Sequence, residues 1–165
     1  MSTTSELLLV KKIRFILVVF IIGLVLSGIT AFPIETQLSV VDAHLYLFPQ
    51  FMQSWLHNVY MAVQTTNATY PFLSYGTDWL AFAHIVIAIA FIGPYKHPVR
   101  NIWVVQFGMI ACVLVLPLAL IAGEIRHIPL YWRIIDCMFG VVGFIPLYVC
   151  YRYIVALEKL EKKNF

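Results

Sequence analysis

Four long runs of apolar residues alternate with polar segments along the chain. The runs cover residues 13–32, 75–95, 102–122 and 131–154. A helix that crosses the hydrocarbon core of a membrane needs roughly 20 mostly apolar residues, and backbone in lipid must satisfy its own hydrogen bonds. The connections Gly93–Asn101 and Gly123–Leu130 are short, so consecutive runs are predicted to be antiparallel neighbours. The sequence therefore predicts an all-α fold, an integral membrane antiparallel four-helix bundle that forms one transmembrane domain over residues 1–165.

The remaining connection, residues 33–74, is long and has a pattern of its own. Apolar residues recur in it at three- and four-residue spacing: Phe51, Met52, Trp55, Leu56, Val59, Tyr60 and Val63. Polar residues fill the opposite face: Gln53, Ser54, His57, Asn58 and Gln64. This spacing predicts an additional amphipathic helix, which either lies in the membrane interface or packs over the mouth of the bundle.

Composition indicates that the four runs are membrane spans, and the positions of the charged residues indicate how the spans are oriented. Hydrophobic residues make up 62% of the chain and charged residues 12%, with a mean hydropathy of +0.89, which excludes an ordinary soluble domain. Nine of the 11 Lys and Arg residues fall on one side of the four spans: Lys11, Lys12, Arg14, Lys96, Arg100, Arg152, Lys159, Lys162 and Lys163. The positive-inside rule makes that side the cytoplasm. We therefore expect a multi-pass protein of the plasma (inner) membrane with both termini cytoplasmic. The net charge of +3 then reports topology, and no nucleic-acid partner is expected.

The first run has an alternative interpretation as a cleaved signal peptide. It begins with basic residues at Lys11, Lys12 and Arg14 and ends in small residues near Ser27 and Ala31. Its apolar stretch is longer than the ~7–15 residues typical of a signal core, which favours an uncleaved membrane anchor.

Among the His, Asp and Glu residues, His84 and Asp136 lie deepest within predicted spans, whereas Asp78 lies near a span end. Small residues mark close helix contacts in lipid, and both titratable residues share a face with such residues. Asp136 is on the face of Gly140 and Gly143, and His84 is on the face of Ala81 and Ala88. In the first run the predicted inward face is Gly23, Ser27 and Thr30. We therefore expect His84 and Asp136 to point into the bundle, in its outer half.

A carboxylate in a span is costly and is expected to have a partner. His84 and Arg133 are the natural partners of Asp136, and other charged residues lie near the same end of the spans. The predicted ligand-binding set is His84, Asp136, Asp78, Glu124 and Arg133. No residue is assigned a catalytic role, because no motif fixes the geometry of a reaction.

Metal and haem sites use the same residue types. Carboxylates and imidazoles are the ligands of zinc and non-haem iron, but the sequence has no His-Glu-x-x-His or Cys-x-x-Cys motif, so the metal question stays open. A haem with two histidine ligands would need a second imidazole at the depth of His84. No cofactor is assigned. Cys112, Cys137 and Cys150 are expected at different depths, as unpaired small apolar residues.

Particular segments of the chain resemble a known family. The run Tyr70-Pro71-Phe72-Leu73-Ser74-Tyr75-Gly76-Thr77-Asp78-Trp79, followed by Gly93-Pro94 and Pro98-Val99-Arg100-Asn101, resembles a small, functionally uncharacterised family of four-span bacterial inner-membrane proteins. The resemblance runs from about Phe32 to Tyr153, implies the four-span fold and brings no catalytic residues. The layout is also loosely similar to the sterol-isomerase and sigma-2-receptor group, in topology only.

Three hypotheses on function follow. The first is a membrane protein with an outer-leaflet polar pocket that binds a small or lipophilic ligand around His84 and Asp136. The second is a membrane enzyme that uses this pair as acid and base on a lipid or quinone-like substrate. The third is an accessory subunit whose polar face is buried against a larger membrane-protein partner. Membrane lipid is an expected partner in each case.

Overall fold

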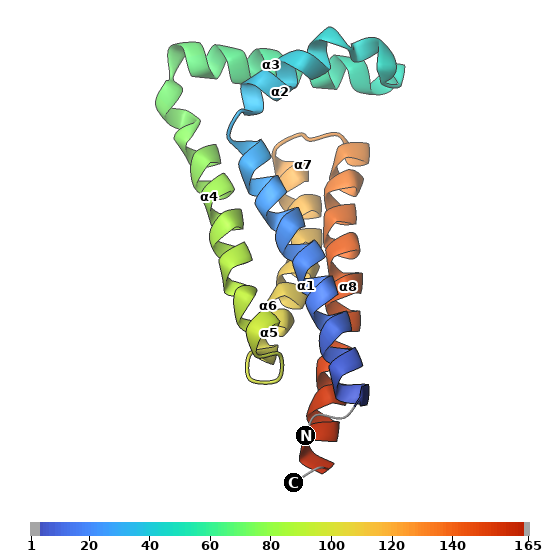
Figure 1. Ribbon diagram of the computed structural model, residues 1–165. Coiled ribbons are helices and arrows are strands. Elements are labelled where there is room, and N and C mark those ends of the chain that lie inside the picture. The colour runs from blue at the N-terminus through green and yellow to red at the C-terminus, as the bar shows by residue number, and fades with distance from the viewer. Residues whose placement is uncertain (1–3, 164–165) are drawn as a thin grey trace. The chain divides into compact units, whose positions relative to one another are not determined.

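A computed structural model describes residues 4–163 of the chain. This part is built from helices and contains no strand, which confirms the all-α fold class. The elements are α1 (Thr4–Ala31), α2 (Ile34–Ala43), η1 (Leu45–Leu47), α3 (Gln50–Thr69), η2 (Pro71–Leu73), α4 (Tyr75–Ala90), α5 (Ile92–Lys96), α6 (Ile102–Pro117), η3 (Leu118–Ala122), α7 (Gly123–Ile125) and α8 (Leu130–Lys163), as Figure 1 shows.

Four helical stretches are long and apolar enough to cross a membrane: Thr4–Ala31, Pro71–Lys96, Ile102–Ile125 and Leu130–Lys163. Each corresponds to one predicted span. The first begins earlier than predicted and ends at Ala31, one residue short, whereas the other three contain their predicted spans and extend beyond them. The residues that precede the first predicted span are helical from Thr4 onward, because residues 4–12 hold no helix breaker. At the other end α8 continues through the charged segment to Lys163.

Prolines interrupt two of these stretches. Pro94 has no N–H to donate to the carbonyl of Ala90, and the helix breaks at Phe91, between α4 and α5. Pro117 ends α6, and the next five residues form η3, a π-helix. A π-helical turn holds an extra residue, so the side chains that follow are rotated relative to those of a regular α-helix.

The chain divides into two compact units, which are described separately. The larger unit holds residues 4–22 and 88–163 of the described chain, and the smaller unit holds residues 23–87. Within the larger unit, segments of all four long stretches share one core. Its fully buried side chains include Ile13, Leu17, Phe91, Val105, Leu147 and Ile154.

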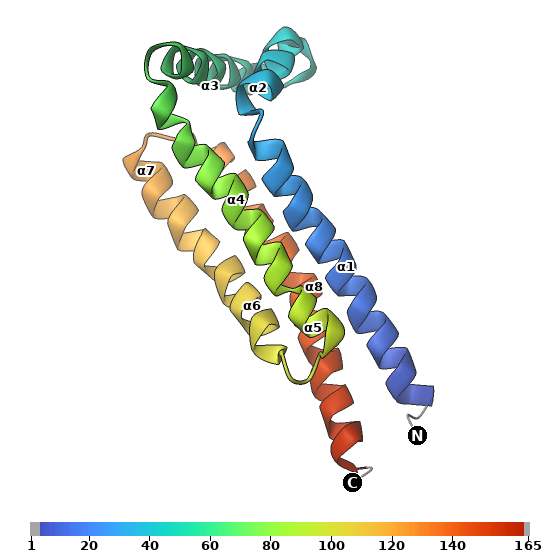
Figure 2. The same cartoon turned by 60° about the vertical axis from the view of Figure 1, so that its left-hand side comes forward.

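The closest packing in the larger unit is between α6 and α8, which lie alongside each other (Figure 2). A Cβ on Gly140 would lie 2.5 Å from the backbone oxygen of Cys112, and one on Gly143 would lie 2.9 Å from Cys112 Sγ. A Cβ on Gly108 would likewise lie 2.7 Å from Phe91 Cζ. These glycines therefore let the helices approach closely, as predicted for Gly140 and Gly143 of the fourth span.

The connection from α7 to α8 contains a residue in the left-handed conformation, just after the end of α7. His127 has φ of 56°, its N–H donates to the oxygen of Glu124 at 3.0 Å, and the N–H of Ile128 donates to the oxygen of Gly123 at 2.9 Å. This pair of bonds is the Schellman arrangement, in which glycine is the usual left-handed residue.

Replacing His127 with glycine is expected to stabilise the protein by about 1 kcal/mol, because the left-handed conformation costs a residue with a Cβ roughly 1–2 kcal/mol. The measurement is thermal unfolding of the detergent-solubilised chain. His44, which also follows a helix but has φ of −122°, is the matched control, and His44→Gly should not stabilise. A lower unfolding temperature for His127→Gly would contradict this account.

The smaller unit contains a helical hairpin formed by α2 and α3. Both helices run crosswise to the parts of α1 and α4 in the same unit (Figures 1 and 2). His57 Nδ1 lies 2.8 Å from Asp42 Oδ1, and Asn67 Nδ2 donates to Glu35 Oε2 at 2.5 Å, so polar contacts join α2 and α3 at two places. Asn67 Oδ1 also accepts a hydrogen bond from Ser74 Oγ.

The amphipathic helix predicted for the long loop is confirmed as α3. Leu56 on its apolar face is 5% exposed, whereas Ser54, His57 and Asn58 on the opposite face are exposed. The prediction is wrong in detail at Phe51, which is 64% exposed, and at Gln53, which is half-buried and donates to the oxygen of Phe48.

The small-residue face predicted for the first span is wrong. Gly23, Ser27 and Thr30 are exposed, and Gly28 is the buried residue. A Cβ on Gly28 would lie 2.8 Å from the backbone oxygen of Ala81 in α4. The error is one of helical phase, since Gly28 lies about 100° around the helix from Ser27.

Candidate functional site

Arg133 is the arginine of the predicted ligand-binding set, and most of its side chain is enclosed by the protein. It lies in the first turn of α8, and its side chain is only 13% exposed. Its Nη1 lies 2.5 Å from Glu124 Oε2 and donates a long hydrogen bond of 3.4 Å to the oxygen of Leu120. Because the Glu124 side chain is 72% exposed, the ion pair is screened and contributes about 0.2–1 kcal/mol.

The local sequence makes room for this arginine. Pro117 and the π-helix η3 precede α7, which begins at Gly123. A Cβ on Gly123 would lie 2.5 Å from Arg133 Cδ and 2.7 Å from Cγ, so the absent side chain leaves the path that the arginine stem follows. The Nε–H of Arg133 is buried and finds no acceptor among residues 4–163. A buried donor left without a partner costs about 1–3 kcal/mol.

Asp136 lies one turn further along α8 and is half-buried. It shares the helix face of Gly140, the residue that touches Cys112 of α6, so this face is directed toward α6. No hydrogen bond or ion pair joins Asp136 to another described residue of the larger unit. The expectation that Arg133 pairs with Asp136 is wrong, because the arginine pairs with Glu124 instead.

His84 and Asp78 belong to the smaller unit. His84 is half-buried on α4, and its Nδ1 donates to the oxygen of Leu80 at 2.8 Å, which leaves Nε2 as an acceptor. Its Cβ lies 3.3 Å from the position that a Cβ on Gly28 would take, so His84 adjoins the contact between α1 and α4. Asp78 is half-buried in the first turn of α4, where the helix dipole favours a carboxylate.

The predicted site is therefore brought together only in part. Glu124 and Arg133 form an ion pair, and Asp136 lies one turn from that pair, all in the larger unit. His84 and Asp78 lie in the smaller unit, so the pairing of His84 with Asp136 spans the two units and stays a prediction. Among residues 4–163, no group of three or more His, Cys, Asp and Glu side chains is placed to hold a metal ion.

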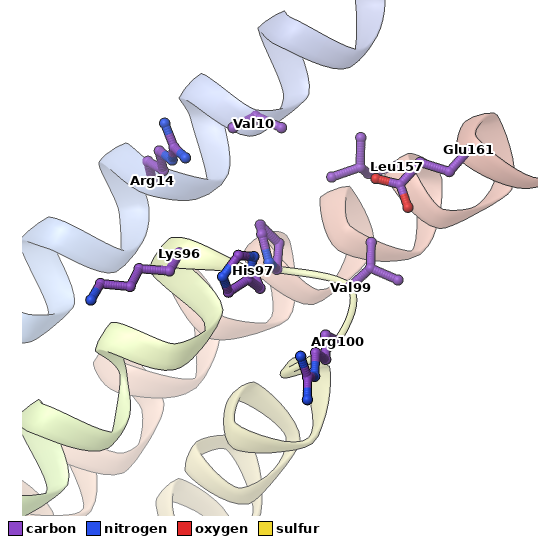
Figure 3. A pocket seen from close by; sticks show the side chains of 9 residues that line it. Val10, Arg14, Lys96, His97, Val99, Arg100, Leu157 and Glu161 are labelled. Atoms are coloured by element: carbon purple, nitrogen blue, oxygen red, sulfur yellow. The ribbon is translucent and has the colours of Figure 1, made fainter. Parts of the chain in front are cut away.

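Two open clefts contain none of these five residues. One, of about 270 Å³, lies in the smaller unit beside the Asn67–Ser74 contact and is lined partly by Thr66 and Thr77. The other, of about 440 Å³, lies in the larger unit and is lined by basic residues of two segments (Figure 3). Sequence analysis missed the basic cleft, although its charges were visible, because they were interpreted only as a marker of orientation.

No protein-family model, curated protein or solved structure matches the chain. The class of protein defined by the fold is an all-helical chain with four stretches able to cross a membrane.

Proposed function

We propose that the chain is an integral membrane protein that binds a small or lipophilic ligand at the α6–α8 end that carries Arg133 and Asp136. One observation carries this proposal. The unpartnered Nε–H of Arg133 and the unpartnered carboxylate of Asp136 lie one turn apart on the same helix. Buried polar groups are nearly always hydrogen-bonded, so a buried donor and a half-buried acceptor left open one helical turn apart suit a ligand with both kinds of group.

The proposed orientation places this site in the outer half of the plasma (inner) membrane, with both termini cytoplasmic. Arg14 of α1, Lys96 of α5 and Glu161 of α8 line one cleft, so these parts of three helices lie at the same end of the larger unit. Basic residues concentrate at that end, as the positive-inside rule requires of a cytoplasmic face. Arg126 and Arg133 belong to the opposite, outer end.

The experiment is native mass spectrometry of the full chain, purified from its host membrane in mild detergent. We expect a co-purified species on the parent protein and its loss from Asp136→Asn, because the amide keeps the size of the carboxylate but not its charge. Glu158→Gln removes one carboxylate from the same helix, far from Arg133, and should retain the species. Equal retention by all three proteins, or no bound species on any of them, would refute the proposal.

An accessory subunit is the second candidate. It is favoured by the half-buried position of Asp136, which lines neither cleft, since a partner helix could supply its missing contact. Loss of a co-purifying membrane protein from Asp136→Asn, without loss of a small molecule, would favour it. The enzymatic hypothesis, with His84 and Asp136 as acid and base on a lipid or quinone-like substrate, uses the same residues and gains no separate support.

A further inference from the structure

The cleft of about 440 Å³ in the larger unit has a basic rim built from two segments that are distant in sequence. Arg14 comes from α1, and Lys96, His97 and Arg100 come from the end of α5 and the turn into α6 (Figure 3). Arg14, Lys96, His97 and Arg100 are all exposed. Glu161 of α8 is the one carboxylate that lines it. The cleft therefore has an excess of positive charge and can accept an anion.

The basic side chains are held on an ordered turn. Pro94 and Pro98 are buried on either side of Lys96. Asn101 Nδ2 donates to the oxygens of Gly93 and His97, both at 3.1 Å, and this closes the turn. These contacts fix the turn. The backbone that carries Lys96 and Arg100 is therefore already ordered before a ligand binds, and this lowers the entropic cost of binding.

Arg14 is positioned by a contact with the same turn. Its guanidinium carbon lies 5.4 Å from the centre of the Tyr95 ring, and its Nε donates to the oxygen of Tyr95 at 3.3 Å. The contact uses one N–H, so the two terminal nitrogens keep their donors for a ligand. A guanidinium offers such donors in the planar arrangement that matches two oxygens of a phosphate.

We propose that this cleft binds a phosphate group, supplied by the headgroup of an anionic phospholipid. Phosphate matches the combination of a guanidinium fork and flexible point charges. Val10, Val99 and Leu157 also line the cleft, so a headgroup held there has apolar side chains beside it for the start of its acyl chains. A basic pocket between membrane helices is the usual form of an anionic-lipid site. A soluble phosphate ester shares the same chemistry, and the experiment separates the two sources.

The test uses Lys96→Gln combined with Arg100→Gln in the full chain. Neither side chain makes a hydrogen bond or ion pair within residues 4–163, so the double variant should fold. Lys11→Gln combined with Lys159→Gln removes two exposed positive charges outside the cleft and is the matched control. Native mass spectrometry in detergent measures binding of phosphatidylglycerol, with phosphatidylcholine as the zwitterionic reference. A basic residue near an anionic lipid is worth about fivefold in affinity, so the cleft variant should bind about thirtyfold more weakly.

Four comparisons decide the result. The control variant should change affinity by less than about twofold if the ordered cleft, rather than total charge, selects the lipid. Glu161→Gln should bind more tightly than the parent, because it removes the one negative charge of the lining. Equal loss in the cleft and control variants, or equal binding of phosphatidylcholine, would overturn the proposal. Displacement of phosphatidylglycerol by millimolar inorganic phosphate would retain the phosphate site and overturn the lipid as its source. None of these outcomes depends on Asp136.

Discussion

Replacing Gly140 with alanine is expected to lower the thermal unfolding temperature by about 5–10 °C. The added Cβ would lie 2.5 Å from the backbone oxygen of Cys112 and 3.5 Å from its carbonyl carbon. A backbone oxygen cannot swing aside as a side-chain tip can, so α6 and α8 must move apart. Overpacking of this kind costs roughly 1–3 kcal/mol. For a chain of this length each kcal/mol corresponds to about 2–4 °C.

Gly23 provides the matched control for Gly140. It is also a helical glycine, in α1, but nothing lies within 4 Å of the Cβ that an alanine would add. Alanine is preferred over glycine in a helix by about 1 kcal/mol, so Gly23→Ala should raise the unfolding temperature slightly. Both variants are compared with the parent by thermal unfolding in one detergent. The close-packing account fails if Gly140→Ala is as stable as Gly23→Ala.

The role of Gly140 could be predicted from the sequence, whereas that of Gly28 was missed. Gly140 shares its face with Gly143 and Asp136, and a polar residue among small ones identifies the inward side of a span. The first span has no ionisable residue among its small ones. Gly23 and Ser27 mark one face of the helix and Gly28 marks another, and the sequence gives no reason to prefer either face. The residue that selects Gly28 is Ala81, which lies 53 positions away in sequence.

Other features depend on contacts that no local pattern contains. The helix α2 follows Pro33 and mixes apolar with polar residues, so it lacks the clear spacing that revealed α3. Glu35 and Asn67 are 32 residues apart when they pair. Pro117 indicates a break in the third span. The residues that follow it are apolar in either form of helix, so the sequence does not reveal that they form a π-helix. The spans themselves were predictable because membrane insertion depends on local hydropathy.

For the candidate site, residue type was predictable and partner choice was not. Arg133, Glu124 and Asp136 were identified as charges near one end of the spans. Which carboxylate the arginine would choose depends on the turn after α7, where the Schellman bonds at His127 fix the path of the chain from Glu124 to α8. Asp136 is nearer to Arg133 in sequence, yet Glu124 forms the ion pair.

A double-mutant cycle on Asp136 and His84 is expected to show little coupling in the ligand-free protein. If the two residues formed a structural pair, Asp136→Leu or His84→Leu alone would leave a buried polar group unpaired and cost about 3–5 kcal/mol. We expect Asp136→Leu instead to be at least as stable as the parent, because Asp136 has no partner in the larger unit and leucine suits a span far better than a carboxylate. His84→Leu should cost only about 1 kcal/mol, since its hydrogen bond is to the oxygen of Leu80 in its own helix.

The four proteins of the cycle are compared by denaturant unfolding in one detergent. Independent sites give a coupling free energy within about 0.5 kcal/mol, whereas paired residues give up to about 3 kcal/mol. Strong coupling together with two destabilised single variants would assign His84 and Asp136 to holding the fold together. Weak coupling, together with an Asp136→Leu variant as stable as the parent, would show that the fold does not depend on this pair. A carboxylate is costly in a span, and in that case the fold does not need this one. Asp136 is then assigned to the binding of a ligand.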